Sequence, residues 1–126
     1  DTATYNSNFK ILNRNLIHIF CDSTQSWQDT SDGQIGRKLA EVIRTSQFKT
    51  PFNQKTILVQ ENSFDPNDYG YQFCSWISVI AQDTPDVSPA DLEAWSIDLG
   101  EKARNGEYYF SISVMSVIAH KLLHTD

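Results

Sequence analysis

The sequence predicts a single α+β domain, and three observations support this. Its 126 residues are the size of one ordinary domain, and folding at that length buries roughly two-thirds of the unfolded chain's surface. Hydrophobic residues make up 40% and charged residues 21%, a balance typical of globular proteins. Strand-like patterns are concentrated before residue 61 and helical patterns after residue 69, and no repeat or linker divides residues 1–126.

The N-terminal part of the chain predicts a β-hairpin. Residues 4–11 are polar and fit an edge strand, whereas residues 16–21 are apolar, with β-branched side chains at Ile17 and Ile19. The turn-forming sequence Asn-Arg-Asn at residues 13–15 lies between them. We therefore expect the first two strands to pair across this turn.

A helix and a third strand are expected next. Residues 31–33 (Ser-Asp-Gly) predict the start of an amphipathic helix that ends near Phe48. Its apolar side chains are spaced three and four residues apart, which places them on one face: Ile35, Leu39, Val42 and Ile43. Residues 56–60 then predict a short strand, and residues 61–68 a polar loop.

Three further helices are predicted in the C-terminal half. The first begins at Tyr69, and its apolar residues have helical spacing: Phe73, Trp76, Ile77 and Ile80. The second has Ser88 as N-cap, Pro89 in the first turn and Asp91 completing a capping box, and it ends near Gly106. Residues 108–123 contain many β-branched side chains, but the length of the segment favours a third helix.

Charge, hydropathy and cysteine content exclude several classes of protein. The net charge is −6 and the ten basic residues are scattered, so we expect no nucleic-acid partner. No stretch approaches the roughly twenty apolar residues of a membrane span, and no signal peptide opens the chain. Cys21 and Cys74 both lie in apolar runs and are expected to be buried free thiols, which favours an intracellular protein in the nucleus or cytoplasm.

The order of several short motifs resembles a known family. Phe20-Cys21-Asp22-Ser23 ends a predicted strand, an amphipathic helix follows, and Asp68-Tyr69-Gly70 opens the next predicted helix after the strand at 56–60. Residues 117–126 are similar to the final helix of the same family. Together these segments resemble the Ulp/SENP cysteine proteases, which process and remove SUMO and related modifiers. The resemblance covers nearly the whole chain, corresponds to the catalytic portion alone, and implies a papain-like core with a small sheet packed on helices.

The resemblance also implies that the catalytic triad is not intact. Asp22 keeps the orienting carboxylate, but Tyr69 stands where the nucleophilic cysteine is expected. The family's His-Trp pair falls near Thr4 and Tyr5, so the base is missing. Gln60 is the candidate for the oxyanion-hole glutamine, although three extra residues separate it from the nucleophile position. A phenol with a pKa of about 10 and no base is a poor nucleophile at neutral pH.

The resemblance therefore predicts a catalytically degenerate Ulp/SENP-like domain that serves as a protein-interaction or scaffolding module. Tyr5, Trp27 and Tyr69 are the candidate aromatic docking residues. The expected partner is a ubiquitin-like modifier or a subunit of a complex. A dimer, with itself or with a complementary subunit, is also expected, and no cofactor or metal is implied.

Two alternatives stay open. One is an active ubiquitin-like-protein-specific cysteine protease with a rearranged or incomplete site, in which Cys21 or Cys74 works with His18. The chain begins at Asp1 rather than Met, so sequence that completes such a site is expected upstream. The other is an unrelated α+β binding domain that holds a divalent metal through Asp22, Thr24 and Ser26. His120 and His124 are one helical turn apart in the predicted last helix, but no motif supplies a third metal ligand.

Overall fold

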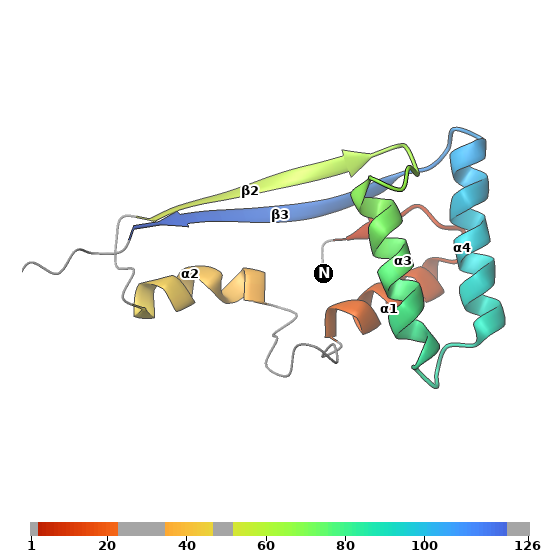
Figure 1. The fold of residues 1–126 in the computed structure, drawn as a ribbon, viewed down its shortest axis with the longest axis horizontal. Coiled ribbons are helices and arrows are strands. Elements are labelled where there is room, and N and C mark those ends of the chain that lie inside the picture. Colours follow the sequence, from red (N-terminus) through yellow and green to blue (C-terminus); the bar gives the residue numbers. More distant parts are fainter. Residues whose placement is uncertain (1–2, 23–34, 47–51, 121–126) are drawn as a thin grey trace, which may run out of the picture.

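The computed structural model describes residues 3–22, 35–46 and 52–120, and within them it confirms the α+β class. Figure 1 shows a body formed by β1, α1, α3 and α4, from which the long pair of strands β2 and β3 projects with α2 beside it. The three strands form an antiparallel sheet in the order β1-β3-β2. In chain order the elements are β1 (Thr4–Tyr5), α1 (Lys10–Asp22), α2 (Ile35–Thr45), β2 (Phe52–Glu61), α3 (Tyr69–Gln82), α4 (Pro89–Arg104) and β3 (Phe110–Ala119).

The predicted N-terminal hairpin is wrong, because the segment at residues 16–21 belongs to helix α1. Asn13, Leu16 and Ile17 are the buried residues of this helix, and their spacing of three and one places them on a single face. The Asn13 side chain lies inside the protein, where its Oδ1 accepts a hydrogen bond of 3.0 Å from Trp95 Nε1. An asparagine that signals a turn in isolation is therefore held in a helix by a tertiary hydrogen bond.

The core lies where α1, α3, α4 and the near end of the sheet meet. The largest fully buried side chains are Trp95, Phe110, Leu16, Ile77 and Leu99. The ring of Tyr5 packs against Trp95 edge to face, with 5.6 Å between centroids, and lies 4.8 Å from the ring of Phe110. Burying each such side chain stabilises the fold by about 1.5–3 kcal/mol.

The signals predicted for helix α4 are confirmed. Ser88 is the N-cap, and its Oγ accepts a hydrogen bond of 3.1 Å from the Asp91 N–H. Pro89 is the first helical residue, and the helix ends before Gly106, whose φ of 72° lies in the left-handed region. Inside the helix, the buried Asp98 carboxylate accepts hydrogen bonds from Ser7 Oγ (2.7 Å) and Asn8 N–H (2.9 Å). This contact fastens the β1–α1 connection to α4.

Two other predicted helices are confirmed in their described parts. Helix α3 begins at Tyr69 as expected, and α2 falls within the range predicted from its apolar spacing. The residues expected to start α2, at 31–33, lie outside the described part of the chain.

The C-terminal segment is a strand, so the prediction of a helix there is wrong. Strand β3 pairs with β2 over ten residues, from Phe110 opposite Glu61 to Ala119 opposite Phe52. Its β-branched side chains favour this extended pairing, and the partner strand is twice as long as the predicted strand at 56–60. The prediction of a helix used the length of the apolar segment, and that length does not show that a strand of equal length is available to pair with it.

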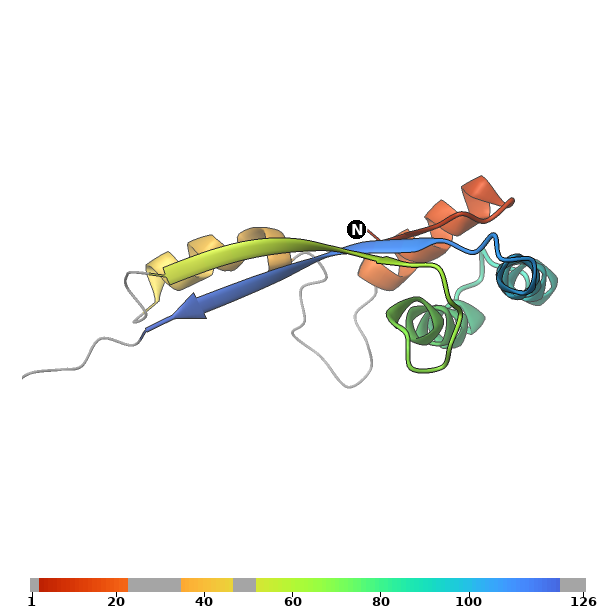
Figure 2. The same ribbon diagram turned by 90° about the horizontal axis from the view of Figure 1, so that it is seen from above.

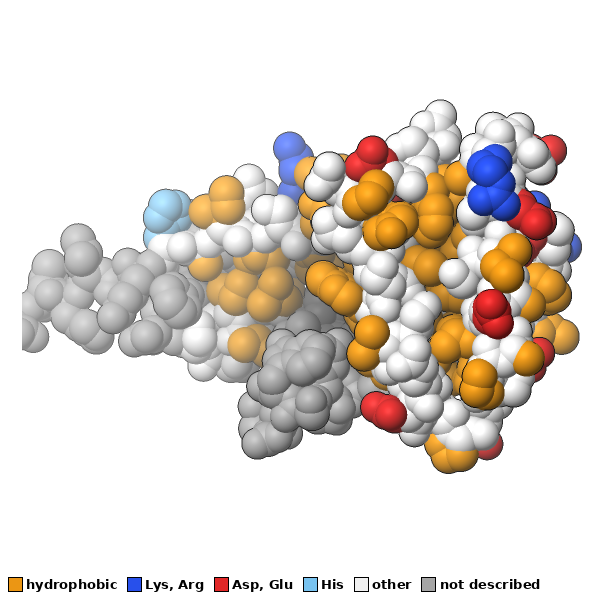
Figure 3. Space-filling view, turned by 45° about the vertical axis from the view of Figure 1, so that its right-hand side comes forward, with side chains coloured by type: hydrophobic (Ala, Val, Ile, Leu, Met, Phe, Trp, Pro, Cys, Tyr) orange, Lys and Arg blue, Asp and Glu red, His pale blue; other side chains and the backbone are white. Residues whose placement is uncertain are grey.

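The β2–β3 ribbon, defined as these ten residue pairs, is about 33 Å long. Figure 2 shows it from above as a twisted two-stranded arm that leaves the helical body, with α2 along part of its length. Three of its apolar side chains are strongly exposed: Ile57 (49%), Leu58 (58%) and Ile118 (61%). In Figure 3, apolar side chains are visible on the arm as well as on the body.

Candidate functional site

The structure brings together some of the triad-equivalent residues. Tyr5 Oη donates a hydrogen bond of 2.7 Å to the carbonyl of Gly70, so β1 contacts the first turn of α3, where Tyr69 lies. Gln60 precedes Glu61 near the same turn, but its Nε2 donates to Tyr109 Oη at 2.8 Å. Thr4 is exposed on β1. Trp27 lies outside the described residues.

Asp22 is not part of this group. It is the last residue of α1 and is exposed. Nine residues separate it from Asn13, whose Nδ2 lies 3.4 Å from the Tyr5 carbonyl oxygen, and nine residues of helix span about 13 Å. The expected role of Asp22 depended on a strand ending at this position, and the structure has a helix there.

The C-terminal segment also has a different secondary structure from the one that the resemblance implied. Residues 117–119, which resembled the start of the family's last helix, are part of strand β3, and residues 121–126 lie outside the described chain. The resemblance thus depended on a predicted strand at residues 16–21 that is a helix, and on a predicted helix at residues 117–119 that is a strand.

The buried groups around Tyr5 are held in their neutral forms. Burial raises the pKa of the Cys74 thiol to about 11. Burial also raises the pKa of Tyr5 and of Tyr108 well above the ordinary tyrosine value, and the nearby Cys74 and Glu61 add to the shift in both. A thiol with this pKa is almost entirely protonated at neutral pH and is a poor nucleophile.

No described histidine activates either cysteine. Cys21 is half-buried one turn beyond His18 on α1, and Cys74 is buried in α3. Within residues 3–22, 35–46 and 52–120, no hydrogen bond joins His18 to Cys21, Cys74 or Asp22. The rearranged Cys–His site therefore has no geometric support in this part of the molecule.

The N-terminus of α3 is occupied by a carboxylate of the protein itself. Glu61 Oε2 accepts from the Tyr69 N–H at 3.0 Å, and Oε1 accepts from the Gly70 N–H at 2.7 Å. These are amide groups that a helix leaves without intrahelical partners, and a negative charge there also interacts favourably with the helix dipole. Glu61 thus joins the end of the ribbon to the helical body and fills the anion-binding position at this helix end.

The close approach of α3 to the sheet explains Gly70. A side-chain β-carbon at this position would lie 2.9 Å from Phe110 Cγ and would overlap the hydroxyl of Tyr108. Only glycine lets the first turn of α3 lie directly on these two rings. Tyr108 Oη itself is buried and has no hydrogen-bond partner among the described residues.

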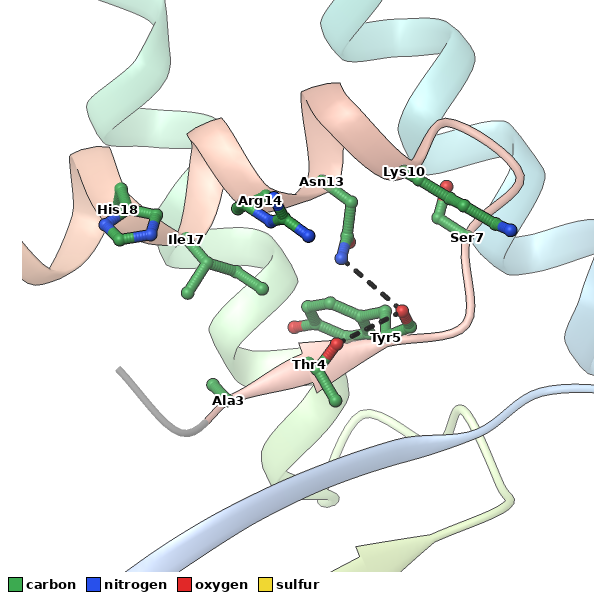
Figure 4. Close-up of a pocket in the computed structure, with 9 residues that line it drawn as sticks. All are labelled: Ala3, Thr4, Tyr5, Ser7, Lys10, Asn13, Arg14, Ile17 and His18. Atoms are coloured by element: carbon green, nitrogen blue, oxygen red, sulfur yellow. Dashed lines mark hydrogen bonds between the residues drawn. The ribbon is translucent and has the colours of Figure 1, made fainter.

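A cavity of about 410 Å³ lies between β1 and α1 and is named here the α1–β1 pocket. Figure 4 shows its nine lining residues, with Lys10, Arg14 and His18 in a row along α1. None of the nine is acidic; the other six are Ala3, Thr4, Tyr5, Ser7, Asn13 and Ile17. The sequence signal was the four-residue spacing of the three basic residues, but the predicted strand at 16–21 concealed it.

The outer edge of β2 is a second candidate site. Strand β2 pairs with β3 on one side, and among the described residues no strand pairs with its other side. Helix α2 contacts β3, whereas β2 is the outermost strand of the sheet. Backbone N–H and C=O groups on such an edge are a template for another strand.

Metal and membrane sites receive no support from the described residues. No cluster of three or more histidine, cysteine, aspartate or glutamate side chains there could hold a metal ion. Thr24, Ser26 and His124 lie outside those residues. Among the described helices, none combines the length and apolarity needed to cross a lipid bilayer.

Comparison of the chain with protein-family models, curated proteins and solved structures gave no match. The resemblance to the Ulp/SENP proteases gains no support from these comparisons, and the function is inferred from the geometry of the chain.

Proposed function

We propose that this chain is a protein-interaction module that associates with a second copy of itself by pairing β2 with β2 of the partner. The observation that carries the proposal is the outer edge of β2, which runs for ten residues along the arm and pairs with no strand in the described part of the chain. In an antiparallel pair about half of the backbone N–H and C=O groups of an outer strand point away from its neighbour. Another strand can therefore be added along this edge.

The edge lacks most of the features that prevent such pairing. Natural edge strands are commonly short, interrupted by proline or a bulge, or covered by charged side chains. Strand β2 has ten residues in unbroken register with β3, contains no proline, and has one charged side chain, Lys55, before its last residue, Glu61. An isolated two-stranded ribbon is also only marginally stable in water, so a partner strand would stabilise the arm.

The sequence of β2 is compatible with symmetric self-pairing. In a two-fold antiparallel arrangement centred on Leu58, residues equally far from the centre lie opposite each other. Lys55 then lies opposite the partner's Glu61, whose carboxylate also accepts from the Tyr69 and Gly70 N–H groups of its own chain, and by symmetry this oppositely charged pair occurs twice. At the centre the two Leu58 side chains face each other, flanked by Ile57 opposite Val59. A second copy of the chain is therefore the partner that the composition of this strand favours.

Replacement of Leu58 tests the pairing directly. Its side chain is 58% exposed, so Leu58→Lys and Leu58→Glu should each leave the monomer folded. Each variant would set two like charges against each other at the centre of the dimer, and we expect dimerisation to weaken roughly tenfold or more. Light scattering coupled to gel filtration, at about 1 µM to about 1 mM, measures the mass.

Mixing the two variants is the decisive step, because opposite charges at the centre should restore the dimer. Ile118→Lys is the matched control: it adds the same charge at an equally exposed position on β3 rather than β2, and it should dimerise as the wild type does. A wild-type chain that stays monomeric over this range, or a dimer unaffected by Leu58→Lys, would show that β2 does not self-pair.

The degenerate Ulp/SENP-like domain with a papain-like core is a separate proposal, favoured by one observation. The Tyr5–Gly70 hydrogen bond does bring two of the triad-equivalent regions together. The docking role suggested for Tyr5 would require the chain to open, because its side chain is 5% exposed, whereas Tyr69 is 54% exposed. Covalent capture by ubiquitin-like proteins with C-terminal electrophiles tests whether any thiol is active in such a scaffold.

A further inference from the structure

We propose that the α1–β1 pocket binds a small anionic ligand, a phosphorylated or polycarboxylate compound, through Lys10 and Arg14. This site is independent of the proposed pairing of β2. The proposal stands on three observations: the position of the basic side chains, the absence of acidic groups among the described lining residues, and the shape and chemistry of the rest of the lining.

The three basic residues of the pocket are brought together by helix α1. Lys10, Arg14 and His18 are four residues apart, and each step of four turns the helix by about 40° beyond a full circle. All three therefore lie on one face, over a length of about 12 Å. Figure 4 shows the three side chains along α1 beside Asn13 and Ile17, which point towards β1, the other wall of the pocket. Lys10, Arg14 and His18 are exposed and form the outer rim of the pocket.

The positive charge of this face is not neutralised by the described part of the protein. Like charges four residues apart on a helix repel each other slightly. The side chains of Lys10, Arg14 and His18 form no ion pair or hydrogen bond with another described residue. The chain has sixteen acidic residues and a net charge of −6, yet no acidic residue in the described part of the chain lines the pocket.

Two acidic groups in the described part of the chain close to the pocket, Asp98 and Asp22, are placed outside it. Asp98 is buried beneath Ser7, and its carboxylate is already engaged by Ser7 Oγ and the Asn8 N–H. Asp22 lies one turn beyond His18, outside the lining. An anion from solution would therefore meet Lys10 and Arg14 without displacing a carboxylate of the described residues.

The remaining lining indicates the kind of ligand. The guanidinium of Arg14 can hold two oxygens of a phosphate or carboxylate at once, and the Lys10 ammonium adds a point charge. The Asn13 amide, which lies 3.4 Å from the Tyr5 carbonyl oxygen, and the Thr4 hydroxyl add polar groups. Ala3 and Ile17 form an apolar wall beside them. A volume of about 410 Å³ suits a small organic molecule that carries the anionic group.

Isothermal titration of the full chain with inorganic pyrophosphate and with citrate, at low ionic strength, tests the proposal. Pyrophosphate represents phosphorylated ligands and citrate represents polycarboxylates, so the comparison tells which anionic group the site prefers. We expect saturable binding of at least one of them. Binding should weaken roughly tenfold in Arg14→Gln and in Lys10→Gln, because each removes a charge-assisted contact.

Arg104→Gln is the matched control, since it removes one exposed positive charge at the end of α4, outside the pocket lining, and should leave the affinity unchanged. Amide chemical shifts of the wild-type chain supply a readout that needs no variant: the changes caused by the anion should be centred on residues 3–7 and 10–18. The proposal is overturned if neither anion binds saturably, if Arg104→Gln weakens binding as much as Arg14→Gln, or if the shift changes are centred elsewhere.

Discussion

Replacement of Glu61 should destabilise the protein by an amount that the geometry at α3 allows us to work out. Glu61→Ala removes the acceptor of two backbone N–H groups, at 3.0 Å from Tyr69 and 2.7 Å from Gly70. Gly70 is buried, so its amide loses a partner that water replaces poorly, at a cost of about 1–1.5 kcal/mol. Tyr69 is exposed, and with the lost helix-dipole interaction its share is about 0.5–1 kcal/mol.

The expected total is therefore about 2 kcal/mol, which for a chain of this size corresponds to a fall in Tm of roughly 6–10 °C. Glu61→Gln should cost about half as much, because its amide keeps one oxygen acceptor. Urea unfolding measures these values, and the Leu58→Lys background keeps them separate from dimerisation. Glu93→Ala, at an exposed site on α4, is the control and should change stability by less than about 0.5 kcal/mol.

Amide hydrogen exchange adds a local readout to the unfolding experiment. Loss of the carboxylate should speed exchange at Tyr69 and Gly70 before it affects the centre of α3. If Glu61→Ala unfolds within about 0.5 kcal/mol of the wild type, the capping of α3 by Glu61 is not a stabilising contact and the reasoning is refuted.

The remaining predictions concern the packing behind this contact. Gly70→Ala should destabilise the fold by about 3 kcal/mol or more in urea unfolding, because the new methyl group meets the hydroxyl of Tyr108 and the ring of Phe110. A loss below about 1 kcal/mol would show that α3 can move away from β3. Cys74 should resist iodoacetamide in the folded protein at pH 7, since its pKa is raised to about 11, and labelling as fast as that of the unfolded chain would contradict its burial. The raised pKa also makes the stability depend on pH. Its contribution to folding is complete below pH 9, the ordinary pKa of the thiol, and should be lost as the pH rises from 9 through about 11. The free energy of unfolding should accordingly fall over that interval, more in the wild type than in Cys74→Ala.

The predictions from sequence succeeded where the signal is local. The start of α4 is set by Ser88 and Pro89, whose hydroxyl oxygen and fixed φ act within one turn of the chain. The first turn of α3 and the apolar face of α2 likewise depend on residues close together in the sequence. Such patterns carry most of the information needed to place a helix.

The predictions failed where a distant partner decides the structure. Residues 16–21 suit a strand by composition. The segment is a helix because only a helix buries both Leu16 and Ile17 in the core shared with α3 and α4. Residues 110–119 suit either state, and β2, some fifty residues earlier in the chain, makes them a strand. These errors also affected the candidate site. Asp22 was predicted at the end of a strand, and Lys10, Arg14 and His18 share one face only because residues 10–22 form a helix.

The sequence by itself determined that this is one α+β domain with a capped helix at residues 89–104, a helix from Tyr69 and an amphipathic helix at residues 35–45. It also determined that Cys74 is a buried free thiol. Only the tertiary structure decided that the C-terminal strand lies between β1 and β2, that no other described strand pairs with the outer edge of β2, and that three basic side chains line one pocket. The reason is physical: caps and helical spacing act over a few residues, whereas strand pairing and pockets join residues that only the folded chain brings together.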